Sequence, residues 1–204
     1  MLVPSMNLAE IRKEIDKDYP IVYRKMGYVG KALTKSLSTQ AKKAGFQVFY
    51  EYRSPNKNHW IYRVYGTKKK TMYEGVLIYH TGKNLVAITV TCEIKIIYHT
   101  HHFFERYNQR LNLGLTSFSD LVRHFLGSNI IFRFQELEEI EPDVWSMFCL
   151  IPKGAILGTY YRKLEIMKAN TFVTTDMFHE DQHELRMFLK EKFKKYVSSS
   201  SELD

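Results

Sequence analysis

Apolar residues recur at helical spacing through the N-terminal part of the chain. The apolar positions of a first helix are Leu8, Ile11 and Ile15. We expect this helix to end at Pro20, because proline has no N–H to donate within a helix. A second helix is predicted over residues 21–44, with Gly45 as its C-terminal stop. Its apolar positions are Val22, Met26, Val29, Leu33 and Leu37.

Alternating and β-branched segments follow, and they predict strands that pair as hairpins. In the first half of the chain these segments are 46–53, 60–65, 75–80, 85–92 and 94–98. In the second half they are 130–134, 145–151, 155–161 and 164–173. Turn-forming residues separate them, as at 54–58 and 81–84. The acidic run 136–141 is interpreted as a solvated loop or a short helix.

Helical patterns separate the two groups of strands and follow the second. We expect a helix from about Thr100, a short helix capped near Ser117 and stopped by Gly127, and a final helix over 177–196. The fold class predicted is α+β: N-terminal helices, an antiparallel sheet built from hairpins, and a C-terminal helix. The expected organisation is a helical segment (1–45), an α+β domain (46–197) and a disordered tail (198–204).

Composition sets limits on compartment and membrane association. The 204 residues are 45% hydrophobic and 25% charged, and no apolar run approaches the roughly 18 residues that cross a bilayer. The first residues lack the basic flank and apolar core of a secretory signal, so we expect a cytoplasmic protein with no membrane partner. Two cysteines, Cys92 and Cys149, make neither a disulfide framework nor a zinc knuckle.

Charge favours a polyanionic partner such as RNA. Lysine and arginine number 30 against 22 acidic residues, which gives a net charge of +8. The 14 tyrosines and 13 phenylalanines are explained mostly as strand and core residues, although aromatics beside basic groups can stack RNA bases. The candidate nucleic-acid contacts are Lys68, Lys69, Lys70 and Arg123. The lysines of the second helix, among them Lys31 and Lys35, are interpreted as a solvated face.

The densest group of chemically capable side chains lies in the helix expected from Thr100. His102, Arg106 and Arg110 are spaced i, i+4 and i+8, so they share one helix face. Histidine can move a proton near neutral pH, and arginine presents a planar charged fork that matches phosphate oxygens. The apolar stripe for docking this helix onto a sheet is Phe103, Phe104, Tyr107 and Leu111.

The segment His-Phe-Phe-Glu-Arg-Tyr-Asn-Gln-Arg-Leu, which starts at His102, resembles the His-x-x-x-Arg-x-x-x-Arg helix of small toxin-like and phage-encoded RNases. These belong to the barnase, EndoU and RelE-like group, and the resemblance covers roughly residues 99–182. It implies a helical part before an antiparallel sheet, and a Ser or Thr on a late strand that joins the His/Arg set; Thr171 is in that place. The chain differs from the usual pattern in having no glycine directly after the second arginine.

The resemblance implies a metal-independent endoribonuclease with no cofactor, for which a cognate antitoxin or inhibitor protein would be a further partner. His102 would act as general acid/base in attack of a ribose 2′-OH on the adjacent phosphate. Arg106 and Arg110 would stabilise the developing charge, and Thr171 would position the phosphate. This mechanism requires all four groups to converge on one cleft.

The alternative is a non-catalytic nucleic-acid-binding or protein-interaction module of the same fold. In that case internal ion pairs, for example with Glu105 or the acidic run 136–141, would occupy the His/Arg row. A buried row favours this alternative.

Metal-dependent sites are disfavoured, and no metal is expected. The run 179–183 matches the His-Glu-x-x-His pattern, but charged Asp181 and the lack of a third ligand downstream argue against a zinc protease. His99, His101 and His102 could also chelate a metal, because His99 and His101 would share one strand face, but no Asp or Cys partner lies close to them in sequence.

Overall fold

The computed structural model describes residues 1–36, 45–67, 70–90, 96–129, 133–177 and 187. Within these ranges the α-helices are α1 (Leu8–Ser36), α3 (His101–Arg110) and α4 (Phe118–Ser128). The first five strands are β1 (Phe46–Arg53), β2 (His59–Gly66), β3 (Thr71–Thr81), β4 (Asn84–Val90) and β5 (Ile96–His99). The others are β6 (Arg133–Glu141), β7 (Val144–Ile151), β8 (Gly154–Tyr161) and β9 (Ile166–Thr174). The α+β class and the hairpin-built sheet are therefore confirmed.

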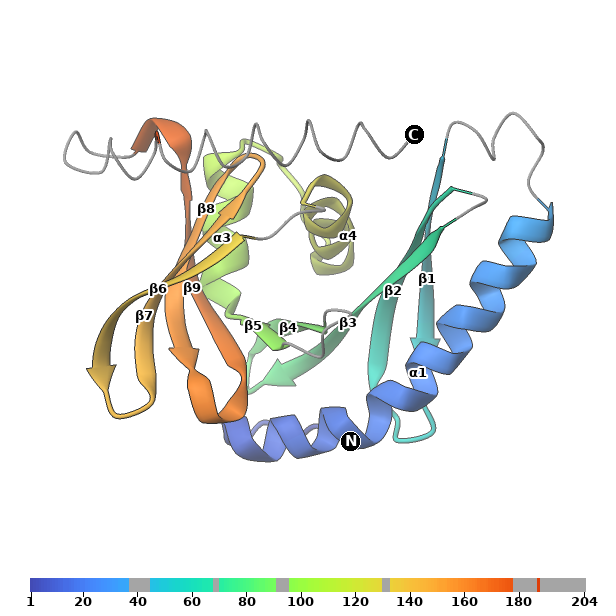
Figure 1. The fold of residues 1–204 in the computed structure, drawn as a ribbon, viewed down its shortest axis with the longest axis horizontal. Coiled ribbons are helices and arrows are strands. Elements are labelled where there is room, and N and C mark those ends of the chain that lie inside the picture. The colour runs from blue at the N-terminus through green and yellow to red at the C-terminus, as the bar shows by residue number, and fades with distance from the viewer. Residues whose placement is uncertain (37–44, 68–69, 91–95, 130–132, 178–186, 188–204) are drawn as a thin grey trace.

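The N-terminal helix differs from the prediction, because α1 runs through Pro20 without ending. The buried positions Ile15, Tyr19, Val22 and Met26 continue one apolar face across the proline, so packing against the sheet maintains the helix despite the lost hydrogen bond. The helix bends along its course in Figure 1. The predicted helix end at Pro20 was wrong. The last positions of the predicted second helix, 37–44, lie outside the described residues.

The nine described strands form one sheet in the order β1-β2-β3-β4-β5-β9-β8-β7-β6. All neighbours are antiparallel except β5 and β9, which are parallel. The sheet is thus two antiparallel meanders joined at their centre by a single parallel pair. The acidic run 136–141 belongs to β6, so its prediction as a loop or helix was wrong. As an edge strand with two register shifts against β7, β6 leaves Glu138, Glu139 and Glu141 exposed, whereas Glu136 is half-buried and pairs with Arg162.

The helices cover the two faces of the sheet, as Figure 1 shows. On one face, Ile15, Val22 and Met26 of α1 pack against the first meander, around Trp60 and Ile88. On the other, α3 and α4 lie between the two halves of the sheet and pack against both meanders. The α3 residues of that second core are Phe103, Phe104 and Tyr107, which confirms the predicted docking stripe.

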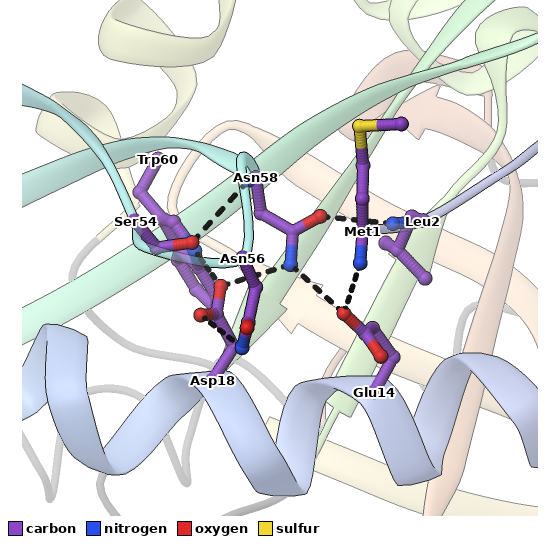
Figure 2. Close-up of polar contacts among 8 residues, drawn as sticks. All are labelled: Met1, Leu2, Glu14, Asp18, Ser54, Asn56, Asn58 and Trp60. Carbon is purple, nitrogen blue, oxygen red and sulfur yellow. Dashed lines mark hydrogen bonds and ion pairs between the residues drawn. The ribbon is translucent and has the colours of Figure 1, made fainter.

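A buried carboxylate fixes α1 against the β1–β2 loop (Figure 2). Asp18 is fully buried and accepts hydrogen bonds from the indole Nε1 of Trp60 at 2.7 Å, from Nδ2 of Asn58 at 2.9 Å and from Nδ2 of Asn56 at 3.0 Å. Asn58 in turn accepts from the backbone N–H of Leu2 at 2.9 Å. Three donors compensate the desolvation of the carboxylate.

The structure shows both ends of α4 and only two residues of the predicted final helix. Ser117 caps α4 as expected, by accepting from Asp120 N, but the helix continues one residue past Gly127. Of the predicted final helix only Met177, in a short 3-10 turn, and Met187 are described, and the rest of that helix and the predicted disordered tail lie outside the described residues. No described helix combines the length and the apolar character that a membrane span needs.

Candidate functional site on α3

The start of α3 is held rigidly against the sheet. Thr100 follows β5 directly, and its hydroxyl oxygen accepts from the N–H of Phe103 at 3.1 Å while its O–H donates to the carbonyl of Ala169 on β9 at 3.1 Å. The buried aromatic side of the helix then fixes its rotation. As a result, the polar edge that carries His102 and Arg106 has a defined direction toward solvent.

His102, Glu105 and Arg106 form a contact chain on this edge. Nε of Arg106 lies 3.4 Å from Nε2 of His102, and Nδ1 of His102 lies 3.6 Å from Oε2 of Glu105. A carboxylate near Nδ1 favours hydrogen on that nitrogen, which leaves the lone pair of Nε2 facing the guanidinium. His102 is 54% exposed. The imidazole and an adjacent guanidinium thus lie together at an accessible surface.

A second imidazole shares the same carboxylate. Nε2 of His101 lies 3.4 Å from Oε1 of Glu105, and its Nδ1 lies 3.3 Å from the carbonyl oxygen of Leu85. Both ring nitrogens face oxygen acceptors, so the ring donates at both positions when it is protonated. Glu105 therefore lies between two histidines. The sequence pointed to Glu105 only as an ion-pair partner of the His/Arg row and did not single out His101 as its neighbour.

Arg110 turns away from this group. Its guanidinium donates to the backbone carbonyl of Phe172 on β9, and the side chain is half-buried. It connects the end of α3 to the sheet, which satisfies a carbonyl and fixes the helix. Sequence spacing placed it on the same helix face as Arg106, and the structure gives it a different partner.

Thr171 lies on the opposite face of the sheet from α3. It pairs with Leu157, which packs with Phe148 and Val173, whereas its neighbour Phe172 packs against α3. The four predicted catalytic residues therefore do not converge. The structure brings His102 and Arg106 together and adds Glu105 and His101.

A hollow of about 410 Å³ adjoins this group. It lies between α3, the α3–α4 connection and the β3–β4 hairpin, and its polar lining includes His80, Lys83, His101, Glu105 and Ser117. His80 and Lys83 bring nitrogen-bearing side chains to the same hollow from a hairpin distant in sequence. Sequence reasoning missed both, because a lysine in a turn carries no local signal of its tertiary neighbours.

The candidate nucleic-acid contacts do not form a patch in the described structure. Lys68 and Lys69 lie outside the described residues, and Lys70 is exposed before β3. Arg123 on α4 forms ion pairs with Asp120 at 3.2 Å and with Glu51 of β1. Those two carboxylates neutralise its charge locally.

Two further side chains of reactive type in the described residues, His99 and Cys149, are buried. His99 is fully buried, its Nε2 is 3.0 Å from the hydroxyl of Thr89, and burial lowers its pKa to about 3. Burial raises the pKa of the Cys149 thiol to about 12, which keeps it protonated. Within the described ranges no three His, Cys, Asp or Glu side chains are grouped to hold a metal, and the run 179–183 lies outside those ranges.

Comparisons of the chain with protein-family models, with curated proteins and with solved structures found no match. The features that bear on function are therefore the α3 geometry, the adjoining hollow, and the motif resemblance on residues 102–111.

Proposed function

We propose that this chain is a metal-independent endoribonuclease whose reacting groups lie on the exposed edge of α3. The observation that carries the proposal is the contact chain from Glu105 through His102 to Arg106, with ring-nitrogen distances of 3.6 and 3.4 Å. It combines an oriented base, an adjacent guanidinium and solvent access. Those are the groups that phosphodiester transesterification needs when acid and base are side chains.

In this mechanism the ribose 2′-OH replaces the Arg106 N–H that Nε2 of His102 accepts, and Nε2 then removes the proton of that hydroxyl. The 2′ oxygen attacks the adjacent phosphorus, and Arg106 donates to the oxygens on which negative charge accumulates. The bond to the 5′ oxygen breaks, and that oxygen takes a proton from protonated His101. The products are a 2′,3′-cyclic phosphate and a free 5′-OH. Glu105 positions both rings.

Two other features support the proposal. The order of elements from α3 through α4 to the four-stranded meander β6–β9 is the helix-before-sheet order that the motif resemblance implies. The hollow beside Glu105 also offers Lys83 and His80 as basic contacts for an adjacent nucleotide. RNA is the substrate class in this proposal, and a cognate inhibitor protein remains part of it.

The test compares purified wild-type protein with His102→Ala on RNA in the presence of a chelator. Wild type is expected to cleave and His102→Ala is not. The matched control is His59→Ala, which removes another partly exposed histidine, on β2, that is paired with Glu51. Cleavage that is equal in all three proteins would refute the assignment to α3.

A non-catalytic binding module is the second candidate. The contact of His102 with Glu105 is the internal pair expected of that alternative, and the placement of two predicted residues also favours it. Arg110 is committed to a backbone carbonyl and Thr171 faces away, so half of the predicted catalytic set is unavailable to a phosphate. This candidate predicts RNA binding without cleavage, and the same affinity for wild type and His102→Ala.

A further inference from the structure

The outward face of α1 carries a basic stripe. Its members, all exposed, are Lys13, Lys17, Arg24, Lys31 and Lys35. On an ideal helix with 3.6 residues per turn these positions fall within an arc of about 40°, and at 1.5 Å rise per residue they extend over about 33 Å along α1, on both sides of Pro20. The stripe lies opposite the buried positions, such as Ile15 and Val22, that pack on the sheet.

The acidic residues of α1 do not neutralise this stripe, because each has another partner. Glu10 accepts from the backbone N–H of Asn7, Glu14 pairs with the amino group of Met1, Asp16 pairs with Arg12, and Asp18 is buried beneath Trp60. Between residues 19 and 50 the sequence has no aspartate or glutamate. In the described part of the chain no member of the stripe forms an ion pair. The stripe is therefore an uncompensated line of positive charge.

Exposed aromatic rings accompany the charges. Tyr28 is 65% exposed and follows Arg24 by one turn, and Tyr23 is 46% exposed with its ring edge against Tyr73. Aromatic rings beside a cationic track are the arrangement with which proteins stack the bases of single strands.

We propose that the stripe on α1 binds the phosphate backbone of single-stranded RNA, with Tyr28 stacking on a base. An anionic membrane would attract the same lysines, but a helix that binds membranes buries its apolar face in lipid, and the apolar face of α1 is already buried on the sheet. This surface lies on the other face of the sheet from α3, so it holds RNA independently of cleavage.

The test measures binding of the full chain to a fluorescent oligouridylate with 2′-O-methyl groups. That probe cannot undergo attack by a 2′-OH, so failure of the proposed cleavage does not affect the result. Lys31→Glu/Lys35→Glu is expected to weaken binding at least tenfold. It should also reduce the magnitude of the slope of log affinity against log salt concentration by about 1.4, because each of the two lost phosphate contacts to a single strand contributes roughly 0.7.

The matched control is Arg53→Glu/Lys153→Glu, which changes the net charge equally at exposed positions on β1 and in the β7–β8 turn. It should bind within about twofold of wild type, as distant surface charges are screened by salt. Tyr28→Ala should weaken binding without changing the salt slope. Equal loss in the two double variants, or no binding by wild type, would overturn the proposal. If Lys31→Glu/Lys35→Glu lost binding to phosphatidylserine vesicles but bound RNA as wild type does, the stripe would be assigned to membranes instead.

Discussion

Arg63 and Glu74 lie directly opposite each other on β2 and β3, and their side chains form an ion pair inside the core. Arg63 is fully buried and also donates to the carbonyl of Leu126 near the end of α4. One guanidinium thus connects two strands and a helix. Because both charges have left water, the pair stabilises the fold only as long as it is complete.

Glu74→Ala is expected to lower the free energy of unfolding by about 3–5 kcal/mol, because it leaves the charge of Arg63 buried and unpaired. The double variant Arg63→Met/Glu74→Leu should recover part of that loss, since no buried charge then remains. Urea unfolding measures both values. If Glu74→Ala were as stable as wild type, water would have to reach the guanidinium of Arg63.

The buried carboxylate of α1 gives a second stability prediction. Asp18→Ala leaves the indole N–H of Trp60 without an acceptor and leaves the amide of Asn58 only its longer contact to Glu14 at 3.5 Å, so we expect a loss of about 3 kcal/mol. Asp16→Ala, on the exposed side of the same helix, is the control and should cost less than about 1 kcal/mol. Similar losses in the two variants would contradict the role given to Asp18.

His99 predicts a dependence of stability on pH. Burial lowers its pKa to about 3 from an ordinary value of 6.5, so between those values the unfolded chain binds a proton that the folded chain does not. The free energy of unfolding should therefore fall as pH drops through this range, by up to about 1.4 kcal/mol per pH unit. His99→Gln removes this titration. Denaturant unfolding at several pH values should show that the difference in free energy of unfolding between wild type and His99→Gln shrinks as the pH falls. A difference that stays constant with pH would contradict this role of His99.

Arg106 and Arg110 are predicted to behave differently, although they are one turn apart on one helix. Arg106→Ala should lower kcat for RNA cleavage by about 100-fold with little change in stability, because it removes a cation from the reacting phosphate. Arg110→Ala should instead lower the melting temperature, because it frees the carbonyl of Phe172. The measurements are kcat and thermal unfolding for both variants. A lower melting temperature for Arg106→Ala together with a lower kcat and unchanged stability for Arg110→Ala would contradict these roles.

Much of the fold follows from local sequence signals. The strands and hairpins of both meanders apart from β6, the cap at Ser117 and the docking face of Phe103 and Tyr107 were predictable, because alternation, turn residues and helical spacing act over a few residues. The passage of α1 through Pro20 was not predictable, because tertiary packing of the helix outweighs the hydrogen bond that proline removes.

The candidate site was predictable only in part, for reasons that are also tertiary. Met167 and Ala169 of β9 face α3, so simple alternation would turn Thr171 toward it as well. A register shift between Leu157 and Gly158 leaves Asn170 as an extra residue on β9, and this bulge turns Phe172 toward α3 and Thr171 away. The contact of Arg110 with β9 likewise joins residues 62 positions apart in sequence.

The most direct test of the central claim uses an oligodeoxynucleotide with one internal ribonucleotide, incubated with the full chain and a chelator. We expect a single cut after the ribonucleotide, a 2′,3′-cyclic phosphate on one product and a 5′-OH on the other, and no cut with His102→Ala. Cleavage at deoxynucleotides, a 5′-phosphate product, or unchanged cleavage by His102→Ala would contradict 2′-OH attack directed by His102.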